Sequence, residues 1–171
     1  MLKAVRTHHG KQEIDMDINM TWLEEHIFHR TLSSDDKIIL KGLIETLHYS
    51  KGEMILEEGQ EPEGLFVLLS GSVLLEHEKN GQKVRIAKLE EGAQFGDMSL
   101  FEGGTTSVSV RAGEACVLYK FSQKSMHYMM EYRQSLSNDI MLNTIRSLAQ
   151  AIRQMNDTQA YTAQYMQGKR A

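Results

Sequence analysis

The chain has 171 residues, of which 41% are hydrophobic, so it is long enough to bury one substantial core and an appended segment. Its net charge of -4 and pI near 6.0 give no general attraction to nucleic acids or anionic membranes. No stretch approaches the roughly 20 apolar residues that span a bilayer, and the N-terminus lacks the apolar run of a secretory signal. These features predict a cytoplasmic protein without membrane attachment.

Thiol and metal chemistry find little support in the sequence. The one cysteine, Cys116, cannot form an internal disulfide, and the apolar run ACVLYKF around it favours a buried strand position over a reactive thiol. His8 and His9 are adjacent but have no third ligand nearby, so no metal site is expected there. Residues 1–20 are polar and are expected to form a flexible N-terminus.

Two short helices are expected next. The sequence TWLE begins at Thr21 with a capping-box pattern that places Glu24 three residues later. The segment SSDDKIILKGLIETL then opens with cap and acidic residues, as helices do. Its apolar positions are Ile38, Ile39, Leu43 and Leu47.

The sequence pattern changes between His48 and Phe121, where short apolar runs are separated by turn signals such as SKGE, LSGS, KNGQ and EGGTT. Spacings of about 8 to 12 residues between such signals predict an all-β sandwich or barrel. Asn80-Gly81 predicts a hairpin, because both positions of a type I′ turn need positive φ. The string GLFVLLSGSVLL is too apolar for a half-exposed strand, so it is expected in the core of two packed sheets.

A long helix is predicted over residues 122–157, where glycine and proline are absent. Apolar residues recur there at gaps of four, three, four and three, which predicts a coiled-coil seam of about two heptads. The seam consists of Met141, Ile145, Leu148, Ile152 and Met155. Its extension past the β region favours a homodimer, with packing on the chain's own barrel as the alternative. The polar residues 158–171 are expected to form a frayed tail.

The order of these elements resembles the cyclic nucleotide-binding domain superfamily, and in particular the effector domains of catabolite activator protein and its relatives. The resemblance rests on GLFVLLSGSV, FGDMSLFEGG and a VRA tripeptide at 110–112, followed by the long helix. It implies a mainly β domain over 21–121, a double-stranded β-helix or jelly roll with flanking helices, followed by the dimerisation helix at 122–157.

The resemblance also implies a phosphate-binding cassette in FGDMSLFEGGTTSVSVRAG. In the family, a short helix after a Phe-Gly pair directs backbone N–H groups at the phosphate of cyclic AMP or cyclic GMP. Asp97 stands where the family has a glutamate that binds the ribose 2′-hydroxyl, and it is one methylene shorter. By position, the cradle falls on Phe95, Gly96, Asp97, Met98 and Ser99.

One departure from the family affects the phosphate directly. The arginine that neutralises the cyclic phosphate falls on Thr106, which is followed by Ser107 at the family's small hydroxyl position. Thr106 shares strand parity with Val110 and is expected to point inward, whereas Arg111 shares parity with Ser107 and Ser109 on the solvent face. Loss of a bidentate arginine costs on the order of 2 to 4 kcal/mol of binding.

In the family, the long helix also contacts the base, and an ungapped register places these contacts at Asn156 or Thr158. The alternative is that both are ordinary polar residues near a helix end. The family's transcription factors continue into a helix-turn-helix domain, whereas only about fifteen residues follow Met155 here. Direct DNA binding is therefore not expected.

Enzymatic alternatives lack the residues they require. A metal-dependent cupin needs clustered histidines and carboxylates, but the β region has only His48 and His77, with no HxH arrangement. No GxSxG motif is present, and haem ligation through Met98 or His77 is not favoured.

Two hypotheses therefore remain. The first is a stand-alone homodimeric regulatory module that senses a cyclic nucleotide or related phosphate ligand and signals through its C-terminal helix to a partner protein. The alternative is an interaction protein that retains only the fold. Gly96 and Asp97 favour the first hypothesis, and Thr106 favours the second.

Overall fold

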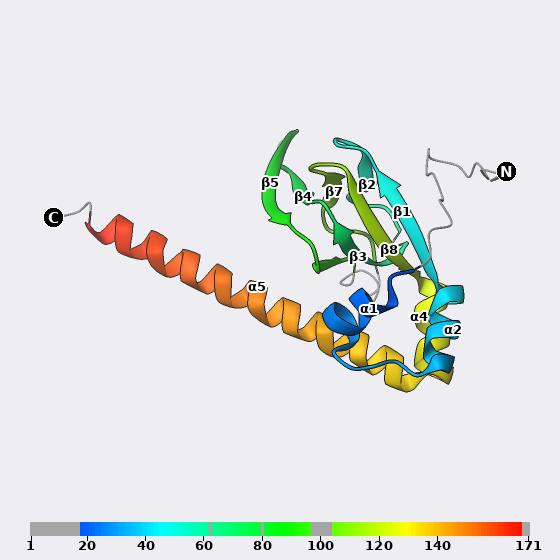
Figure 1. Ribbon diagram of the computed structural model, residues 1–171. Helices are drawn as coiled ribbons and strands as arrows, with labels where there is room; N and C mark the ends of the chain where they lie inside the picture. The colour runs from blue at the N-terminus through cyan, green and yellow to red at the C-terminus, as the bar shows by residue number, and fades with distance from the viewer. Residues whose placement is uncertain (1–17, 62, 80, 97–103, 169–171) are drawn as a thin grey trace.

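The computed structural model describes residues 18–61, 63–79, 81–96 and 104–168, with the backbone alone described at 154 and 157–168. Two four-stranded antiparallel sheets pack face to face, helices cover one end, and a long helix runs away from the sandwich (Figure 1). The predicted mainly β fold of the jelly-roll type with flanking helices is confirmed.

The strands are β1 (Ile44–Tyr49), β2 (Met54–Leu56), β3 (Gly64–Ser70), β4 (Val73–Lys79), β5 (Gln82–Leu89), β6 (Gln94–Phe95), β7 (Ser109–Ala112) and β8 (Cys116–Ser122). The helices are α1 (Met20–Leu23), the π-helix η1 (Glu24–Phe28), α2 (Ser34–Leu43), α4 (Gln123–Tyr132) and α5 (Gln134–Gly168). One sheet has the order β1-β8-β3-β6 and the other β2-β7-β4-β5.

Strand β3 is apolar along most of its length because both faces of its sheet are covered. Phe66 and Leu68 lie in the core between the two sheets, whereas Leu65 and Val67 pack with the helices on the outer face. All four side chains are fully buried. The prediction that GLFVLLSGSVLL enters the core is therefore confirmed for β3, and its lack of polar alternation follows from burial on both faces.

The predicted β-hairpin is formed by β4 and β5, which pair from Val73 opposite Leu89 to Lys79 opposite Gln82. The closing pair leaves a two-residue turn, in which Gly81 has φ +75°. This agrees with the positive φ that the turn type needs, while Asn80 lies outside the described residues.

Helix α2 begins as predicted, because the Ser33 hydroxyl accepts a hydrogen bond from the Asp36 N–H at 3.1 Å. It ends earlier than its apolar pattern suggested. The chain enters β1 at Ile44, and Leu47 is buried between the sheets as a strand residue. The expected helical role of Leu47 was wrong because apolar spacing alone does not distinguish a helix from a strand over so few residues.

The first helix starts just before the predicted capping box. Its N-cap is Asn19, whose side chain accepts from the Trp22 N–H at 3.0 Å, so Thr21 lies inside the helix. Glu24 does not close the box but accepts from the Leu32 N–H at 2.7 Å. The carboxylate thereby fixes the loop that leads into α2.

The C-terminal region differs from the single helix expected over 122–157. It forms two helices, α4 and α5, separated at Arg133, whose φ of -140° and ψ of 53° are not helical. Met129 of α4 and Leu136 of α5 are both fully buried in the core outside the β1-β8-β3-β6 sheet. The change of direction lets both helices contribute to that core.

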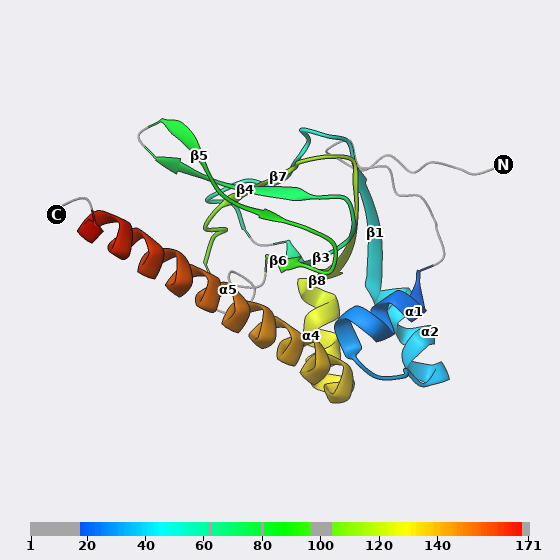
Figure 2. The same ribbon diagram turned by 60° about the vertical axis from the view of Figure 1, so that its left-hand side comes forward.

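Helix α5 continues to Gly168, through much of the segment expected to fray. It starts beside α4 and runs along one side of the sandwich (Figure 2), and its C-terminal half projects away from the sandwich in the view of Figure 1. None of the helices in the described ranges has both the length and the apolarity needed to cross a bilayer.

Gly96, which follows β6, is fixed by packing as well as by its backbone conformation. Its φ is +84°, and a Cβ placed there would lie 2.6 Å from the Gly64 carbonyl oxygen and 3.2 Å from Phe66 Cδ2. The absence of a side chain therefore lets the chain after β6 lie directly against β3.

Gly96→Ala is expected to lower the free energy of unfolding by more than about 2 kcal/mol, because the backbone clash adds to the cost of positive φ. Gly59→Ala is the matched control, since Gly59 also has φ +84° but no atom within 4 Å of the added Cβ. Its loss should be only about 1 to 2 kcal/mol. Urea unfolding of both variants measures the difference, and equal losses would show that contact with β3 is unimportant.

Candidate functional site

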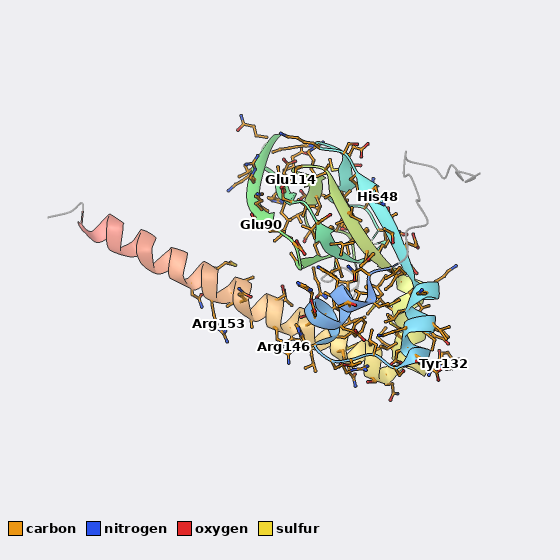
Figure 3. All side chains as sticks on the ribbon, in the orientation of Figure 1. His48, Glu90, Glu114, Tyr132, Arg146 and Arg153 are labelled. Carbon is orange, nitrogen blue, oxygen red and sulfur yellow. The ribbon has the colours of Figure 1, made fainter. Side chains whose placement is uncertain are left out.

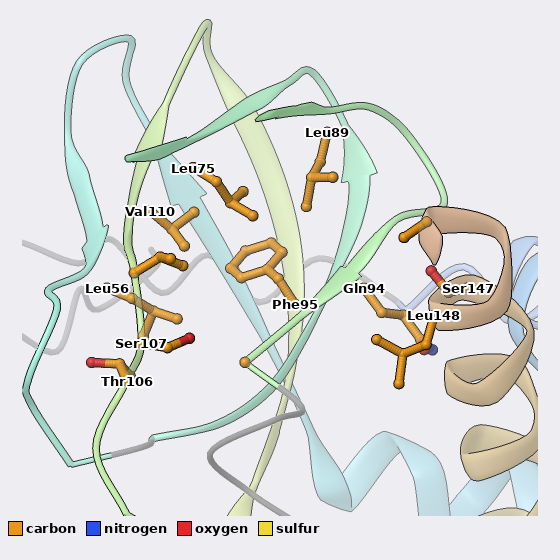
Figure 4. Close-up of a pocket in the computed structure, with 13 residues that line it drawn as sticks. Leu56, Leu75, Leu89, Gln94, Phe95, Thr106, Ser107, Val110, Ser147 and Leu148 are labelled. Atoms are coloured by element: carbon orange, nitrogen blue, oxygen red, sulfur yellow. The ribbon is translucent and has the colours of Figure 1, made fainter. Parts of the chain in front are cut away.

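A pocket of about 210 Å³ lies between the sandwich and α5 (Figure 4). The sandwich contributes an apolar wall, made of Leu56, Leu75, Leu89, Phe95, Val108 and Val110. The polar side chains at its edge are Gln94, Thr106, Ser107 and Ser147. Gly96, Leu148 and Ala151 complete the lining. Such a pocket suits a ligand with an apolar or aromatic body and few polar contacts.

The pocket brings together four of the predicted cassette residues. Phe95, Gly96, Thr106 and Ser107 all line it. The predicted cradle positions 97–99, Asp97, Met98 and Ser99, lie outside the described residues. The Phe95 ring stacks on the Phe66 ring of β3, with 5.3 Å between the ring centroids, and this contact holds Phe95 at the pocket wall.

The contacts from α5 come from an earlier part of the helix than the ungapped register suggested. Ser147, Leu148 and Ala151 line the pocket, roughly two turns before Asn156. Asn156 is exposed and is not among the lining residues, and the side chain of Thr158 is not among those described.

Thr106 is buried, and its hydroxyl serves the protein fold. Oγ1 donates to the Glu57 carbonyl oxygen and accepts from the Gln60 N–H at 3.2 Å. The Thr106 N–H also donates to the Gln60 carbonyl oxygen at 2.8 Å. Its hydroxyl points away from Phe95 in Figure 4. The residue at the family's arginine position thus holds the turn after β2.

The predicted facing of the strand around Thr106 holds in part. Thr106 and Val110 are buried, and Ser107 is exposed to solvent at the pocket edge. Ser109 was expected on the solvent face but is only 8% exposed. Its hydroxyl accepts from the Glu58 N–H at 3.1 Å, so the turn after β2 covers it.

No lysine or arginine is found among the described lining residues, and the sequence has none from Gln94 to Val110. The turn bonded to Thr106 belongs to the segment EEGQEPE, which carries four carboxylates. These are Glu57, Glu58, Glu61 and Glu63. Glu63 lies 2.7 Å from Lys120 and Glu58 lies 2.9 Å from His77, so the segment is partly paired, but neither it nor the lining offers a cation to an anion near Thr106.

Two cations of the strands, Arg111 and Lys120, are engaged elsewhere. Arg111 donates to the Gly52 carbonyl oxygen at 2.6 Å and lies 3.4 Å from Glu76, on the face away from the pocket, as predicted. Lys120 is buried and pairs with Glu63 at 2.7 Å. Neither side chain lines the pocket, so neither replaces the family's arginine there.

Gln94 was missed by sequence reasoning. It is only 9% exposed, lines the pocket, and its Oε1 accepts a hydrogen bond of 2.9 Å from the hydroxyl of Thr144 in α5. The pair therefore connects β6 to the long helix in a buried setting. The available signal was a polar residue directly before Phe95, the first residue of the predicted cradle.

Cys116 is a buried strand residue, as predicted. Burial raises the pKa of its thiol to about 11, and the carboxylates of Glu53 and Glu114 add to the rise. A thiol with this pKa is a poor nucleophile at neutral pH. Within the described ranges, no three histidine, cysteine or acidic side chains gather as a potential metal site.

The family model for cyclic nucleotide-binding domains matches residues 46–133, just over half of the chain. This match covers nearly the whole sandwich and α4. The chain belongs to the cyclic nucleotide-binding domain family.

Two curated relatives and one solved structure illustrate the range of similarity. Glutaminase 1 of Bradyrhizobium diazoefficiens is 30% identical over 154 residues, which cover 78% of this chain and 24% of the relative. The cAMP-activated global transcriptional regulator CRP of Pasteurella multocida is 24% identical over 64% of this chain and 53% of its own. The chain thus spans from about a quarter to half of these relatives.

A cyclic nucleotide-binding domain from Methylobacillus flagellatus has the same fold, with a TM-score of 0.70 and 20% identity. The similarity covers 81% of this chain and 79% of that structure.

Thr106→Val is expected to destabilise the protein by about 1 to 3 kcal/mol, because it removes the hydroxyl that joins Glu57 to Gln60 while keeping the side-chain shape. Ser107→Ala is the control, since Ser107 is exposed and its substitution should stay within about 0.5 kcal/mol. Thermal unfolding of both variants provides the measurement. A Thr106→Val protein as stable as wild type would exclude the structural role of the hydroxyl.

Proposed function

We propose that this chain is a homodimeric regulatory module of the cytoplasm, in which a small ligand controls the position of α5 and α5 signals to a partner protein. The observation that carries the proposal is the composition of the pocket wall. Phe95 comes from the sandwich and Leu148 from α5, so a ligand between them contacts both parts at once. A ligand that binds one helix position better than another shifts the equilibrium between them.

The ligand that the family membership suggests is a cyclic nucleotide, cyclic AMP or cyclic GMP, or a related phosphate compound. The apolar wall around Phe95 suits its base. The phosphate has a weaker environment, because Thr106 carries no charge and its hydroxyl is bonded to the turn at 57–60. We therefore expect most of the binding free energy to come from the base and sugar.

Homodimerisation is proposed through the seam predicted from the sequence. Four of its members are large apolar side chains that remain exposed in the single chain. These are Ile145 at 60%, Leu148 at 42%, Ile152 at 57% and Met155 at 61%. A second copy of α5 would cover a stripe with this heptad spacing.

A second candidate is an interaction protein that keeps the fold but binds no nucleotide. Thr106 and the neighbouring glutamates of the segment 57–63 support this alternative. Its function would lie in the α5 surface and the dimer. Neither candidate assigns a catalytic role to this chain.

Calorimetric titration with cyclic AMP and cyclic GMP distinguishes the candidates. We expect wild type to bind at least one of them with Kd below about 100 μM, and Thr106→Arg to bind roughly thirty- to thousandfold more tightly, because it restores charge-assisted bonds to phosphate. Binding by Thr106→Arg alone would instead support the interaction protein. Circular dichroism of both proteins controls for folding.

The dimer is tested by Ile152→Glu, which would bury two carboxylates in the seam. We expect wild type to sediment at twice the chain mass of 19.5 kDa and Ile152→Glu to sediment as a monomer. Arg146→Glu is the control, because Arg146 points away from the sandwich in Figure 3 and is not a seam member. A dimeric Ile152→Glu protein would contradict the proposed interface.

A further inference from the structure

The carboxamide of Gln94 is only partly satisfied in this conformation. Its Oε1 accepts from Thr144 at 2.9 Å, but its Nε2 is buried and has no hydrogen-bond partner among the described residues. Burial of an amide donor without an acceptor is unfavourable. Turning the amide over would pair Nε2 with Thr144 Oγ1, whose own proton can go to the Ile140 carbonyl oxygen at 3.0 Å, but it would leave Oε1 unpaired instead. In either orientation one end of the buried carboxamide lacks a partner, which a ligand can supply.

A ligand in the pocket is one source of such an acceptor. Gln94 lines the pocket, although Nε2 itself is shielded from solvent. Rotation about the terminal torsion of glutamine has a broad, roughly two-fold profile, so the amide can turn toward the pocket at little torsional cost. That rotation weakens the bond to Thr144, since the same group would then serve the ligand.

The surroundings define the chemistry of the ligand. The walls are apolar, and no described lining residue is cationic. An uncharged aromatic ring fits these walls better than an anion. An engineered cavity of about 150 Å³ holds benzene, so a pocket of about 210 Å³ has room for a larger ring.

The carboxamide of Gln94 narrows the class of ligand further. A glutamine carboxamide pairs with the adjacent donor and acceptor on one edge of adenine, whereas the corresponding edge of guanine presents two acceptors. A ring with the adenine pattern offers an acceptor for Nε2 and a donor for Oε1, the atom that otherwise accepts from Thr144.

We propose that Gln94 is the ligand-reading residue of this pocket, that it selects an adenine ring, and that its carboxamide is shared between the ligand and Thr144 of α5. This inference rests on the proposed ligand-controlled function and identifies the group that connects ligand to helix. Binding of the ring and the Gln94–Thr144 bond then compete for one amide. The source of the ring, a nucleoside or a cyclic nucleotide, is distinguished by the probes.

The experiment is calorimetric titration of the full chain with adenosine, guanosine and cyclic AMP. Adenosine should bind at least about tenfold more tightly than guanosine, and cyclic AMP should gain less than about tenfold over adenosine because no described lining residue is cationic. Gln94→Met should weaken adenosine binding by about tenfold or more, since it keeps the side-chain length but removes the amide.

Thr144→Val should change adenosine affinity in the opposite direction from Gln94→Met. Loss of the competing hydroxyl should tighten adenosine binding by roughly threefold to tenfold, an effect that damage to the pocket would not produce. Gln134→Met, at the exposed first residue of α5, is the matched control and should leave adenosine affinity unchanged. If Gln94→Met fails to fold, Gln94→Glu is the second variant. It removes the Nε2 donor but keeps oxygens that can accept the hydrogen bond from Thr144.

The outcomes separate this inference from the proposed function. Unchanged adenosine affinity in the Gln94 variant, weaker binding in Thr144→Val, or equal affinity for guanosine would overturn the role of Gln94 while leaving a ligand-controlled module in place. Cyclic AMP binding much more tightly than adenosine would overturn the preference for an uncharged ligand alone. No binding of any probe by wild type would overturn both proposals.

Discussion

Burial of the β1-β8-β3-β6 sheet on both faces is the constraint on which the remaining structure depends. Its inner face packs against the second sheet, and its outer face packs against the helices before and after the sandwich. Strand β3 supplies side chains to both cores, so loss of either core would expose half of an apolar strand. The helices are therefore part of the same folding unit as the sheets, and α5 begins from a fixed position.

The pocket inherits its shape from this packing. Gly96 lies directly against β3, and Phe95 stacks on Phe66, which places β6 at the edge of the sheet beside α5. The helix is anchored nearby by the buried residues Leu136 and Ile140. A small molecule in this pocket would contact the sandwich on one side and α5 on the other.

Much of the fold could be predicted from the sequence because its signals are local. The Asn80-Gly81 turn, the Ser33 cap and the continuous apolar string in β3 each correspond to a distinct conformation or degree of burial. The break at Arg133 could not be predicted in this way. No glycine or proline marks it, and it arises because α4 and α5 must both reach one core.

The site was predictable only where a residue's role follows from strand parity. Thr106 was expected to point inward and is buried, but its hydroxyl bonds to Glu57 and Gln60, in a turn almost fifty residues earlier. Gln94 and Thr144 are likewise fifty residues apart and carry no shared motif. Contacts of this kind are set by tertiary packing, which hydrophobic periodicity does not contain.

Leu148 belongs to two surfaces at once, since it lines the pocket and is also a member of the exposed apolar seam of α5. A substitution at Leu148 therefore changes both surfaces together. The size and shape of the residue at this position set both the pocket wall and part of the exposed apolar stripe. Under the proposed function, ligand binding and helix pairing are therefore coupled through this one side chain.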